Sequence, residues 1–301
     1  MVVWDVQRVG PSTGLPTRTA QSDLTFTYFI GHGDTQNIIL LPGSVNECFE
    51  FGWRAFDIAE RVQTPVFVLS DLDFGMNQWM TEPFQYPEVP MDRGKVFWEE
   101  DLERLKGDWG RYRDVDGDGI PYRTLPGNRH PTSAYFGRGT GHDENARYSE
   151  DNENWRKLLD RLKRKFETAK RYLPAPAVDC MDCAEYGIIA FGSTTPAIQE
   201  ARDELAKQGI QTDYLRVRAI PFTHEVEEFI RNHESVYVVE MNRDGQLNQL
   251  LTIEYPELAT RLRSIAFTDG LPLSARFVRE AIAIWPAKVG DAEGKKEFAK
   301  E

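Results

Sequence analysis

The alternation of apolar and polar positions divides the chain into three parts. In the first 73 residues, short apolar runs alternate with longer segments whose apolar side chains recur at helical spacing. Strands and helices of these lengths, in alternation, indicate a parallel sheet covered by helices. The predicted elements are strands at 2–6, 37–41 and 65–69 and helices at 21–30 and 45–62.

The same alternation returns over residues 185–286 and predicts a second, complete α/β domain. The turn Gly-Ser-Thr-Thr-Pro at 192–196 begins its first helix. We expect this turn to cap the helix, while an anion bound at the helix N-terminus is the alternative. The predicted strands are 186–191, 213–217, 235–240 and 263–267, and the predicted helices are 195–207, 223–232, 246–255 and 275–284.

Residues 74–184 have a different character, being polar, aromatic and rich in proline. Helical patterns occur only at 98–105 and 155–172. A segment this long with so little regular structure usually wraps a neighbouring domain or contributes to a site. The expected organisation is a domain at 1–73, a linker or insert at 74–184, a domain at 185–286 and a flexible tail at 287–301, where apolar periodicity is lost.

Composition and charge exclude several classes of protein. The chain has 301 residues, enough for two ordinary domains, and 41% of them are hydrophobic. A net charge of −12 disfavours sequence-independent binding of nucleic acid, which needs clustered Lys and Arg. We find no apolar run long enough to cross a membrane, and no basic region before an apolar one at the start. The cytoplasm is therefore the expected location.

The three cysteines are too few for a metal cluster within this chain. Cys180 and Cys183 form a C-x-x-C pair, and Cys48 lies far away in the sequence. A tetrahedral zinc or a four-iron cluster usually needs four ligands. Any iron–sulfur cluster that serves this protein should therefore sit on a partner.

The stretch QRVGPSTGLPTRT at 7–19 follows the first strand and is the strongest candidate for a functional loop. Proline fixes φ and glycine permits positive φ, so the stretch predicts a loop of defined shape. Its cationic and hydroxyl side chains suit a small anionic ligand. The alternative is a tight strand-to-helix connection in which Thr17 or Thr19 caps the helix.

A second candidate is the acidic turn DVDGDG at 114–119. Asp114, Asp116 and Asp118 place oxygens at alternate positions, as in the first half of a calcium loop. Leu125 stands where that loop needs a bidentate Glu. An acidic, solvated turn is therefore the favoured interpretation, and the three aspartates stay weak candidates for metal ligands.

The stretch at 7–19 resembles the signature loop of the α subunit of 2-oxoacid:ferredoxin oxidoreductases, especially the 2-oxoglutarate type. Several further motifs of the chain match that family in the same order, so the resemblance covers most of residues 2–286. The other matching motifs are LPGS at 41–44, TPVFVLSD at 64–71, GRYRDVDGDGIPYR at 110–123, VEMNRDGQL at 239–247 and DGLPL at 269–273.

The resemblance implies an α/β fold made of two known pieces. These are the second half of a thiamine-enzyme pyrimidine-binding domain and a domain like the C-terminal domain of transketolase, joined by the long irregular segment. The chain then matches the C-terminal part of the usual α subunit. The first half of the pyrimidine-binding domain would come from an N-terminal portion or a separate γ polypeptide. The sequence does not decide whether Met1 is a natural start or a truncation.

The resemblance also implies cofactors and partners. Thiamine diphosphate, Mg²⁺ and [4Fe-4S] clusters would be held mainly by a β subunit, with none bound by this chain alone. Gly117-Asp118-Gly119 is similar to the start of the motif that binds the diphosphate and magnesium. That motif follows a buried strand and ends in paired asparagines, whereas here the preceding residues are polar and Asn152 and Asn154 are not adjacent. We therefore do not assign it this role.

The activity implied is the oxidative decarboxylation of 2-oxoglutarate with coenzyme A to succinyl-CoA and CO₂, or its reverse. Electrons would pass through the β subunit to ferredoxin, and the chain would be inactive alone. Pyruvate or another 2-oxoacid is an alternative substrate. A non-catalytic assembly subunit and a calcium- or metal-regulated binding module are alternative functions.

The family motif implies substrate contacts but no catalytic residue that we can name. The fork of Arg8 would hold the substrate carboxylate, and the Thr17 hydroxyl would contact the same ligand. Arg18 would pair with the distal carboxylate of 2-oxoglutarate or face solvent. Gly10, Ser12 and Thr13 complete the predicted site, and the two hydroxyl residues are expected mainly to hold the shape of the loop.

Overall fold

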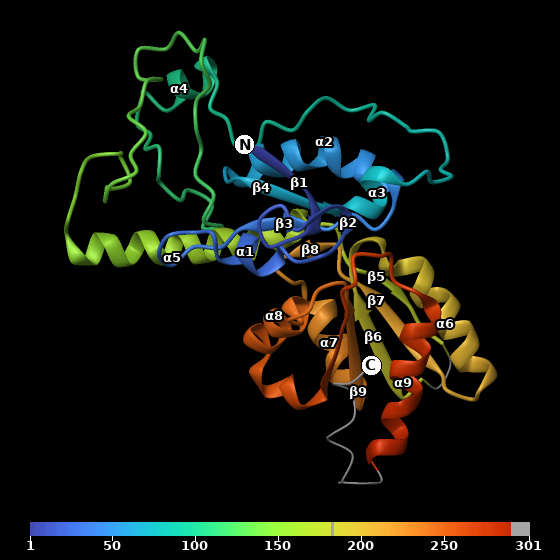
Figure 1. Cartoon of the computed structure of the whole chain (residues 1–301). Coiled ribbons are helices and arrows are strands. Elements are labelled where there is room, and N and C mark those ends of the chain that lie inside the picture. The colour runs from blue at the N-terminus through green and yellow to red at the C-terminus, as the bar shows by residue number, and fades with distance from the viewer. Residues whose placement is uncertain (182–183, 290–301) are drawn as a thin grey trace.

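The chain folds into two stacked α/β layers with a long helix and a set of loops at one side. A computed structural model describes residues 1–181 and 184–289. Figure 1 shows the first sheet above the second, with the irregular segment and helix α5 projecting to the left. Among the helices described, none combines the length and apolar character that crossing a membrane requires.

The first sheet has the order β2-β1-β4-β3-β8. Its central strands β1, β4 and β3 run parallel, as the alternating pattern predicted, and the two edge strands are antiparallel. The second edge strand, β8, comes from the part of the chain predicted to be the second domain. The strands are β1 Val2–Val9, β2 Leu15–Thr19, β3 Ile38–Leu40, β4 Val66–Asp71 and β8 Ala219–Ile220.

Helix α2 (Val45–Val62) has the predicted bounds and covers the first sheet. The side chain of Ser44 caps it by accepting a hydrogen bond from the backbone N–H of Glu47 at 3.1 Å. Its buried residues, which include Phe51 and Ile58, pack into the same core as the β4 side chains. The other helices of this layer are short, at α1 Leu24–Phe29 and α3 Leu72–Met76.

The second sheet has the order β10-β9-β6-β7-β5, and all its pairings are parallel except that of β5. Helices lie on both faces (Figure 1). The strands are β5 Ala177–Asp179, β6 Tyr186–Ala190, β7 Thr212–Arg216, β9 Ser235–Glu240 and β10 Leu262–Ala266. The helices are α6 Thr195–Lys207, α7 His224–Asn232, α8 Gln246–Glu254 and α9 Ala275–Val289, with 3₁₀ turns at Gly192–Thr194 and Pro256–Arg261.

The irregular segment wraps the first layer. After α3 the chain arches over α2 (Figure 1), and Phe84 stacks on Phe49 of that helix with ring centroids 4.7 Å apart. It then forms the short helix α4 (Glu99–Arg104) and the longer α5 (Asn152–Ala169), which leads into a 3₁₀ turn at Lys170–Tyr172. Of the two expectations for this segment, that it wraps a neighbouring domain or contributes to a site, this packing agrees with the first.

The two layers share one hydrophobic core. Leu41 and Leu69 of the first layer belong to the same buried cluster as Ile189 and Phe191 of the second. A buried ion pair also joins them, because both oxygens of Glu47 on α2 accept hydrogen bonds from the Arg216 guanidinium at 2.6 and 2.8 Å. Burial acts to raise the pKa of Glu47, but the hydrogen bonds and charge of Arg216 hold that pKa below its ordinary value.

The prediction of two α/β units joined by a long irregular segment is confirmed, whereas two local expectations are wrong and three short strands were missed. The turn at 192–194 does not cap its helix, because Thr194 makes no side-chain capping hydrogen bond. The last helix continues to Val289 instead of ending at 284. The short strands β2, β5 and β8 were not predicted, because each is an edge strand of two to five residues with a weak apolar pattern. The remainder of the predicted tail, at 290–301, lies outside the described residues.

Candidate functional site

The stretch at 7–19 forms a β-hairpin. Strands β1 and β2 pair with Arg8 opposite Thr19 and Val9 opposite Leu15, with an irregularity between Arg8 and Val9. Thr17 and Thr19 therefore lie in a strand, and the alternative in which one of them caps a helix is wrong. The hairpin was not predicted because its second strand, Leu15–Thr19, is almost entirely exposed and lacks an apolar face.

The backbone fixes the shape of the hairpin loop. Gly14 has φ 47°, and a Cβ there would lie 2.2 Å from the carbonyl oxygen of Val9, so only glycine fits. Ser12 also has positive φ, at 56°. The hydroxyls of Ser12 and Thr13 make no hydrogen bond with any residue that the structure describes, so they do not hold the loop by side-chain contacts.

The hairpin leaves its cationic side chains without internal partners. Arg8, Thr17 and Arg18 are all exposed. Neither guanidinium forms a hydrogen bond or ion pair within the described part of the chain. Arg8 lies opposite Thr19, and Thr17 is two residues from Thr19 along β2. The hairpin thus offers cationic and hydroxyl donors to an external ligand.

A cavity of about 470 Å³ separates the hairpin loop from the turn that precedes α8. It combines two motifs that are more than two hundred residues apart in the sequence. Burial raises the pKa of Asp23, which lies in its wall. The lining residues used below are Gly10 and Pro11 from the hairpin and Asn242, Arg243 and Asp244 from the turn.

The turn after β9 is held rigid by two buried side chains. Glu240 accepts hydrogen bonds from the backbone N–H groups of Leu247 at 2.8 Å and Asn248 at 3.1 Å, at the start of α8. Asn242 accepts from the backbone N–H of Gly245 at 2.8 Å, which closes the turn. Burial raises the pKa of Glu240. The VEMNRDGQL motif therefore has a backbone shape fixed by its own hydrogen bonds, and it places Arg243 and Asp244 in the wall of the cavity.

Gln21 connects the hairpin to the second layer, and sequence reasoning missed it. It is fully buried. Its side chain donates to the carbonyl of Phe191 at 2.8 Å and accepts from the backbone N–H of Met241 at 3.0 Å. Its backbone N–H donates to the carbonyl of Met241 at 2.7 Å. Because its partners lie 170 and 220 residues away, no local pattern identifies the residue.

Asp71, at the end of β4, also links the first layer to the second. Its carboxylate accepts a hydrogen bond from the backbone N–H of Ser193 at 3.2 Å. It also accepts from the backbone N–H of Asp73 at 3.1 Å and lies 3.5 Å from the hydroxyl of Thr19 on β2. Burial raises the pKa of Asp71. The N–H of Ser193 thus meets an internal carboxylate.

Comparison with known proteins identifies the family. Residues 1–99 match the family model described as pyruvate flavodoxin/ferredoxin oxidoreductase, thiamine diP-bdg, and residues 184–264 match pyruvate:ferredoxin oxidoreductase core domain II. The α subunit of 2-oxoacid:ferredoxin oxidoreductase 2 from Aeropyrum pernix is 36% identical over 81% of this chain. The chain belongs to the family of 2-oxoacid:ferredoxin oxidoreductase α subunits.

Two further relatives support the assignment. The 2-oxoglutarate synthase subunit KorA of Methanothermobacter marburgensis is 30% identical over 80% of this chain. The solved 2-oxoglutarate:ferredoxin oxidoreductase from Magnetococcus marinus, with 2-oxoglutarate, coenzyme A and succinyl-CoA bound, is 27% identical, with a TM-score of 0.82 over 94% of this chain. The chain spans 38% of the Aeropyrum subunit, 62% of KorA and 48% of the Magnetococcus chain.

The acidic turn of this family member is occupied by internal cations. The ammonium of Lys95 lies 2.6 Å from an oxygen of Asp116 and 2.7 Å from one of Asp118. Asp114 pairs with Arg164 at 3.0 Å. These ion pairs fill the positions that a calcium ion would need, so the geometry favours the acidic-turn interpretation over a cation site.

Gly119 allows that turn to approach α5 closely. Its φ is 81°, and a Cβ there would lie 2.4 Å from the backbone nitrogen of Lys165 on α5. The backbone carbonyl of Asp118 accepts a hydrogen bond from the Thr168 hydroxyl of the same helix at 2.8 Å. The Gly-Asp-Gly stretch therefore packs its turn directly on α5.

The described cysteines are poorly suited to reactive or ligand roles. Burial raises the pKa of Cys48 to about 12. Burial, followed by the charge of Asp213, also raises the pKa of the exposed Cys180. A raised pKa keeps each thiol protonated at neutral pH, and the thiolate is the form that binds metals. Cys183 lies outside the described residues, so the C-x-x-C pair is not tested.

Proposed function

We propose that this chain is the α subunit, or a part of it, of a thiamine-diphosphate-dependent 2-oxoglutarate:ferredoxin oxidoreductase. The complex would convert 2-oxoglutarate and coenzyme A to succinyl-CoA and CO₂, or run the reverse reaction, and exchange electrons with ferredoxin. Support for the substrate comes from KorA, a 2-oxoglutarate synthase subunit, and from the Magnetococcus enzyme, which has 2-oxoglutarate bound. Within the complex, this chain would supply substrate contacts.

The observation that carries the proposal is the exposed Arg8 guanidinium on a rigid hairpin. A guanidinium fork matches a carboxylate with two parallel hydrogen bonds, and the carboxylate of a 2-oxoacid is such a partner. Because Arg8 has no partner among the described residues, binding would break no existing ion pair. The nearby Thr17 hydroxyl would donate to the same ligand, and Arg18 would pair with the distal carboxylate of 2-oxoglutarate.

We propose that the metal-containing cofactors are held by a β subunit. Within the described part of the chain, no three His, Cys, Asp or Glu side chains are grouped to hold a metal. Asp118, in the one Gly-Asp-Gly stretch of the sequence, already forms an ion pair with Lys95 at 2.7 Å. These donor sets do not fit Mg²⁺ with a diphosphate or a [4Fe-4S] cluster. We therefore derive no step through these groups from this chain's residues.

The first sheet has an open edge where a partner polypeptide would add. Residues 2–7 of β1 pair with β4 on one side, while β2 pairs only with Arg8 and Val9. Trp4 and Val6 in this stretch are 38% and 40% exposed. A strand that has no described partner along one edge and carries exposed apolar side chains is a favourable docking edge. We propose that the remaining part of the pyrimidine-binding domain, on an N-terminal portion of α or a γ polypeptide, covers this edge.

Co-purification and a coupled assay test this function. We expect the chain to be isolated with a partner that carries thiamine diphosphate and iron–sulfur clusters. The complex should reduce ferredoxin with 2-oxoglutarate and coenzyme A, and the separated chain should not. Preference for pyruvate would keep the family and reject the substrate. A stable complex that turns over no 2-oxoacid would instead indicate a non-catalytic assembly subunit.

A further inference from the structure

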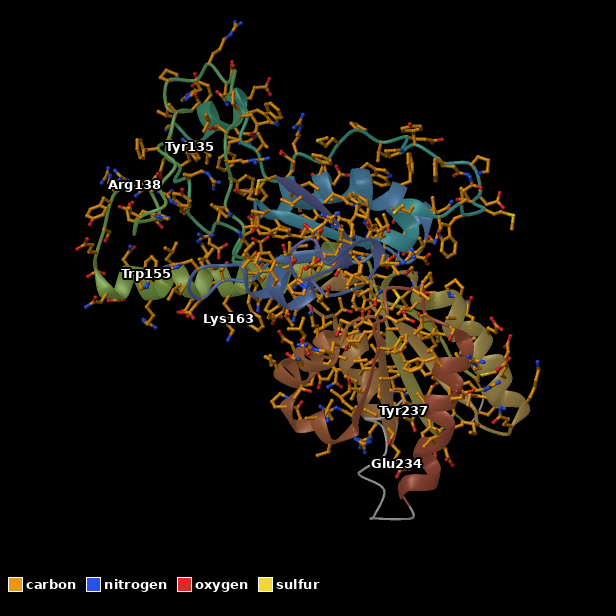
Figure 2. All side chains as sticks on the ribbon, viewed as in Figure 1. Tyr135, Arg138, Trp155, Lys163, Glu234 and Tyr237 are labelled. Atoms are coloured by element: carbon orange, nitrogen blue, oxygen red, sulfur yellow. The ribbon has the colours of Figure 1, made fainter. Side chains whose placement is uncertain are left out.

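A second cavity, of about 260 Å³, lies between α5 and the loops of the irregular segment. It shares no lining residue with the cavity at the hairpin. Figure 2 shows Trp155 on α5, with Tyr135 and Arg138 on the loops to the same side of the helix. The polar and aromatic lining residues that matter here are Arg111, Thr140, His142, Trp155, Arg161 and Lys165.

Two of the cations in this cavity lie on one face of α5. Arg161 and Lys165 are four residues apart and therefore neighbours on the helix surface. Each residue is only 8% exposed. Like charges at this spacing repel each other, and burial removes the water that would screen them. Arg111, from the loop that faces α5, adds a third positive charge.

None of the described residues that line this cavity is acidic, and the carboxylate whose charge acts on Arg161, Asp114, is already paired with Arg164 at 3.0 Å. Arg161 donates only to the backbone carbonyl of Gly119 at 2.9 Å. Lys165 donates only to the carbonyl of Gln63 at 3.3 Å. Arg111 lies over the ring of Tyr112, with its guanidinium carbon 5.0 Å from the centroid. Carbonyls and aromatic rings carry no net charge, so the positive charge remains.

Several donor atoms of this cluster are buried without a partner. They are Nε and Nη1 of Arg111 and Nε of Arg161. A buried donor that makes no hydrogen bond costs about 1–3 kcal/mol, and more when it is charged. Burial, followed by the charges of Arg161 and Arg111, lowers the pKa of Lys165 to about 8. Such a site is costly for the folded chain unless an anion fills it.

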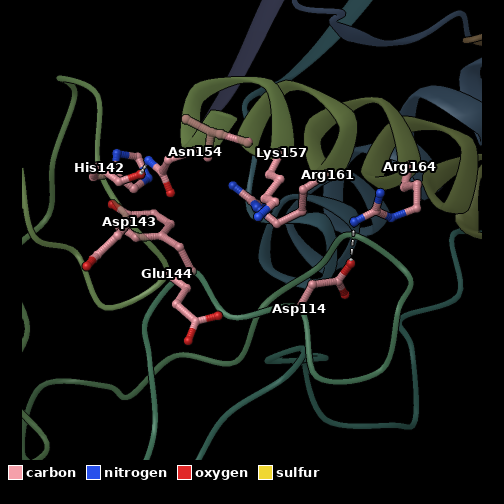
Figure 3. Close-up of a pocket in the computed structure, with 10 residues that line it drawn as sticks. Asp114, His142, Asp143, Glu144, Asn154, Lys157, Arg161 and Arg164 are labelled. Atoms are coloured by element: carbon pink, nitrogen blue, oxygen red, sulfur yellow. Dashed lines mark hydrogen bonds and ion pairs between the residues drawn. The ribbon is translucent and has the colours of Figure 1, made fainter. Parts of the chain in front are cut away.

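The neighbouring cavity shows how this segment normally balances its charges (Figure 3). There Arg164 pairs with Asp114 at 3.0 Å, and the acidic residues Asp143 and Glu144 share the wall with Lys157. Arg161 and His142 line both cavities, and of the two only the cavity that also holds Arg111 and Lys165 has no acidic residue in its described lining.

We propose that the cavity lined by Arg111, Arg161 and Lys165 binds a phosphate group. Three cations suit a doubly charged anion better than a single carboxylate, and two guanidinium groups can each donate two hydrogen bonds to phosphate oxygens. A volume of about 260 Å³ is small for a whole nucleotide. Trp155, which lines the cavity and is 47% exposed, would contact whatever carries the phosphate.

Calorimetry on the full-length chain tests binding directly. Inorganic phosphate and adenosine 3′,5′-bisphosphate would be titrated separately in a buffer without phosphate or sulfate. We expect saturable binding of at least one of them, and a ligand concentration about 100 times Kd should raise Tm by roughly 5 °C. Tighter binding of the bisphosphate would identify a phosphate ester as the source, and equal affinity would identify free phosphate. Absence of saturable binding of either probe up to about 10 mM would overturn the proposal.

Variants of α5 separate a ligand site from a structural cluster. Without ligand, Lys165→Met should raise Tm because it removes a buried like charge, and it should reduce phosphate affinity by roughly tenfold or more. The matched control is Lys163→Met, at an exposed lysine on the same helix that Figure 2 places on the side away from the loops. The control should leave both Tm and affinity nearly unchanged.

Arg161→Gln and Arg111→Gln provide an independent measurement. Each should weaken phosphate binding by roughly tenfold or more, while circular dichroism shows an unchanged fold. If Lys165→Met lowers Tm without ligand, or if phosphate binds equally to wild type and to both arginine variants, the cluster is structural and the proposal fails.

Discussion

The carboxylate of Asp71 accepts a hydrogen bond from the backbone N–H of Ser193, 3.2 Å away and 122 residues later in the chain. Asp71 ends a strand of the first sheet, and Ser193 lies in the 3₁₀ turn that precedes α6. The N–H that would otherwise receive an external anion is therefore satisfied inside the protein. This contact places the signature hairpin against the second layer, since Thr19 of the hairpin lies beside the same carboxylate.

Gly192 makes this approach possible, and replacing it should destabilise the protein. A Cβ at this position would lie 2.4 Å from Nε2 of Gln21 and 3.0 Å from an oxygen of Asp71, and φ is 69°. We expect Gly192→Ala to lower the free energy of unfolding by about 2–4 kcal/mol, from strain and overpacking together. Urea unfolding measures this. Gly209→Ala is the matched control, because Gly209 has φ 83° but no atom lies within 4 Å of a Cβ there. This variant should therefore show only the cost of placing alanine at positive φ, without overpacking.

The ion pair between Glu47 and Arg216 should contribute strongly to the junction between the layers. Glu47→Gln removes the carboxylate that pairs with the guanidinium groups of both Arg216 and Arg218, so we expect a loss of about 3–5 kcal/mol in the free energy of unfolding. The exposed pair of Glu153 and Lys157 on α5 is the control, and Glu153→Gln should cost about 0.5 kcal/mol or less. Equal losses in the two variants would contradict the structural role of Glu47.

Glu47 should also make the protein sensitive to acid. Its folded pKa is below its ordinary value, so its stabilising contribution is present above the unfolded pKa and is lost as pH falls through the folded pKa. Unfolding curves at a series of acidic pH values should show a steeper loss of stability for wild type than for Glu47→Gln. Parallel curves would show that Glu47 does not drive this dependence.

Lys165 should give a pH dependence of the same direction, but in the alkaline range. Its pKa is about 8 in the folded protein and 10.5 without perturbation, so between these values the unfolded chain binds more protons. Stability should therefore rise with pH across this window, by roughly 3 kcal/mol from this group. Arg161 and Arg111 are the charges that face it, and His142 lines the same cavity. Subtracting the curve of Lys165→Met from that of wild type isolates the effect, and a flat difference would contradict it.

Arg8 provides the test of the substrate contact. In the reconstituted complex, Arg8→Lys keeps the charge but loses the bidentate geometry, so kcat/KM for 2-oxoglutarate should fall roughly 100-fold. Stability should barely change because Arg8 has no partner among the described residues. Arg54→Lys, at a surface pair on α2, is the control and should leave kcat/KM unchanged. A stability loss with kcat/KM within about twofold would make Arg8 a structural loop residue.

Replacing Arg18 tests whether this residue distinguishes 2-oxoglutarate from pyruvate. If it reads the distal carboxylate, Arg18→Ala should lower kcat/KM for 2-oxoglutarate far more than for pyruvate, which has no such group. An equal effect on both substrates would place Arg18 outside the specificity contact.

The sequence by itself determined the elements whose patterns are long and local. Helix α2 has its predicted bounds, because eighteen residues of helical periodicity and a capping Ser44 are read directly from neighbouring positions. The family was equally accessible, since the hairpin motif and the VEMNRDGQL turn are short contiguous strings. Sequence also supplied Arg8, Thr17 and Arg18 as site candidates.

The tertiary structure decided what depends on distant partners. Local pattern does not show that Gln21 links the two layers or that Asp71 accepts a hydrogen bond from Ser193. It also does not place β8 in the first sheet. In each case the partner residues lie far away in the chain. The same holds for Arg111, Arg161 and Lys165, which the sequence reads as ordinary charges in a polar segment. What distinguishes them is that folding brings them together in one cavity beside α5, where Arg161 and Lys165 are buried and no described lining residue is acidic. Burial and charge compensation are properties of the folded chain, and short-range sequence does not encode them.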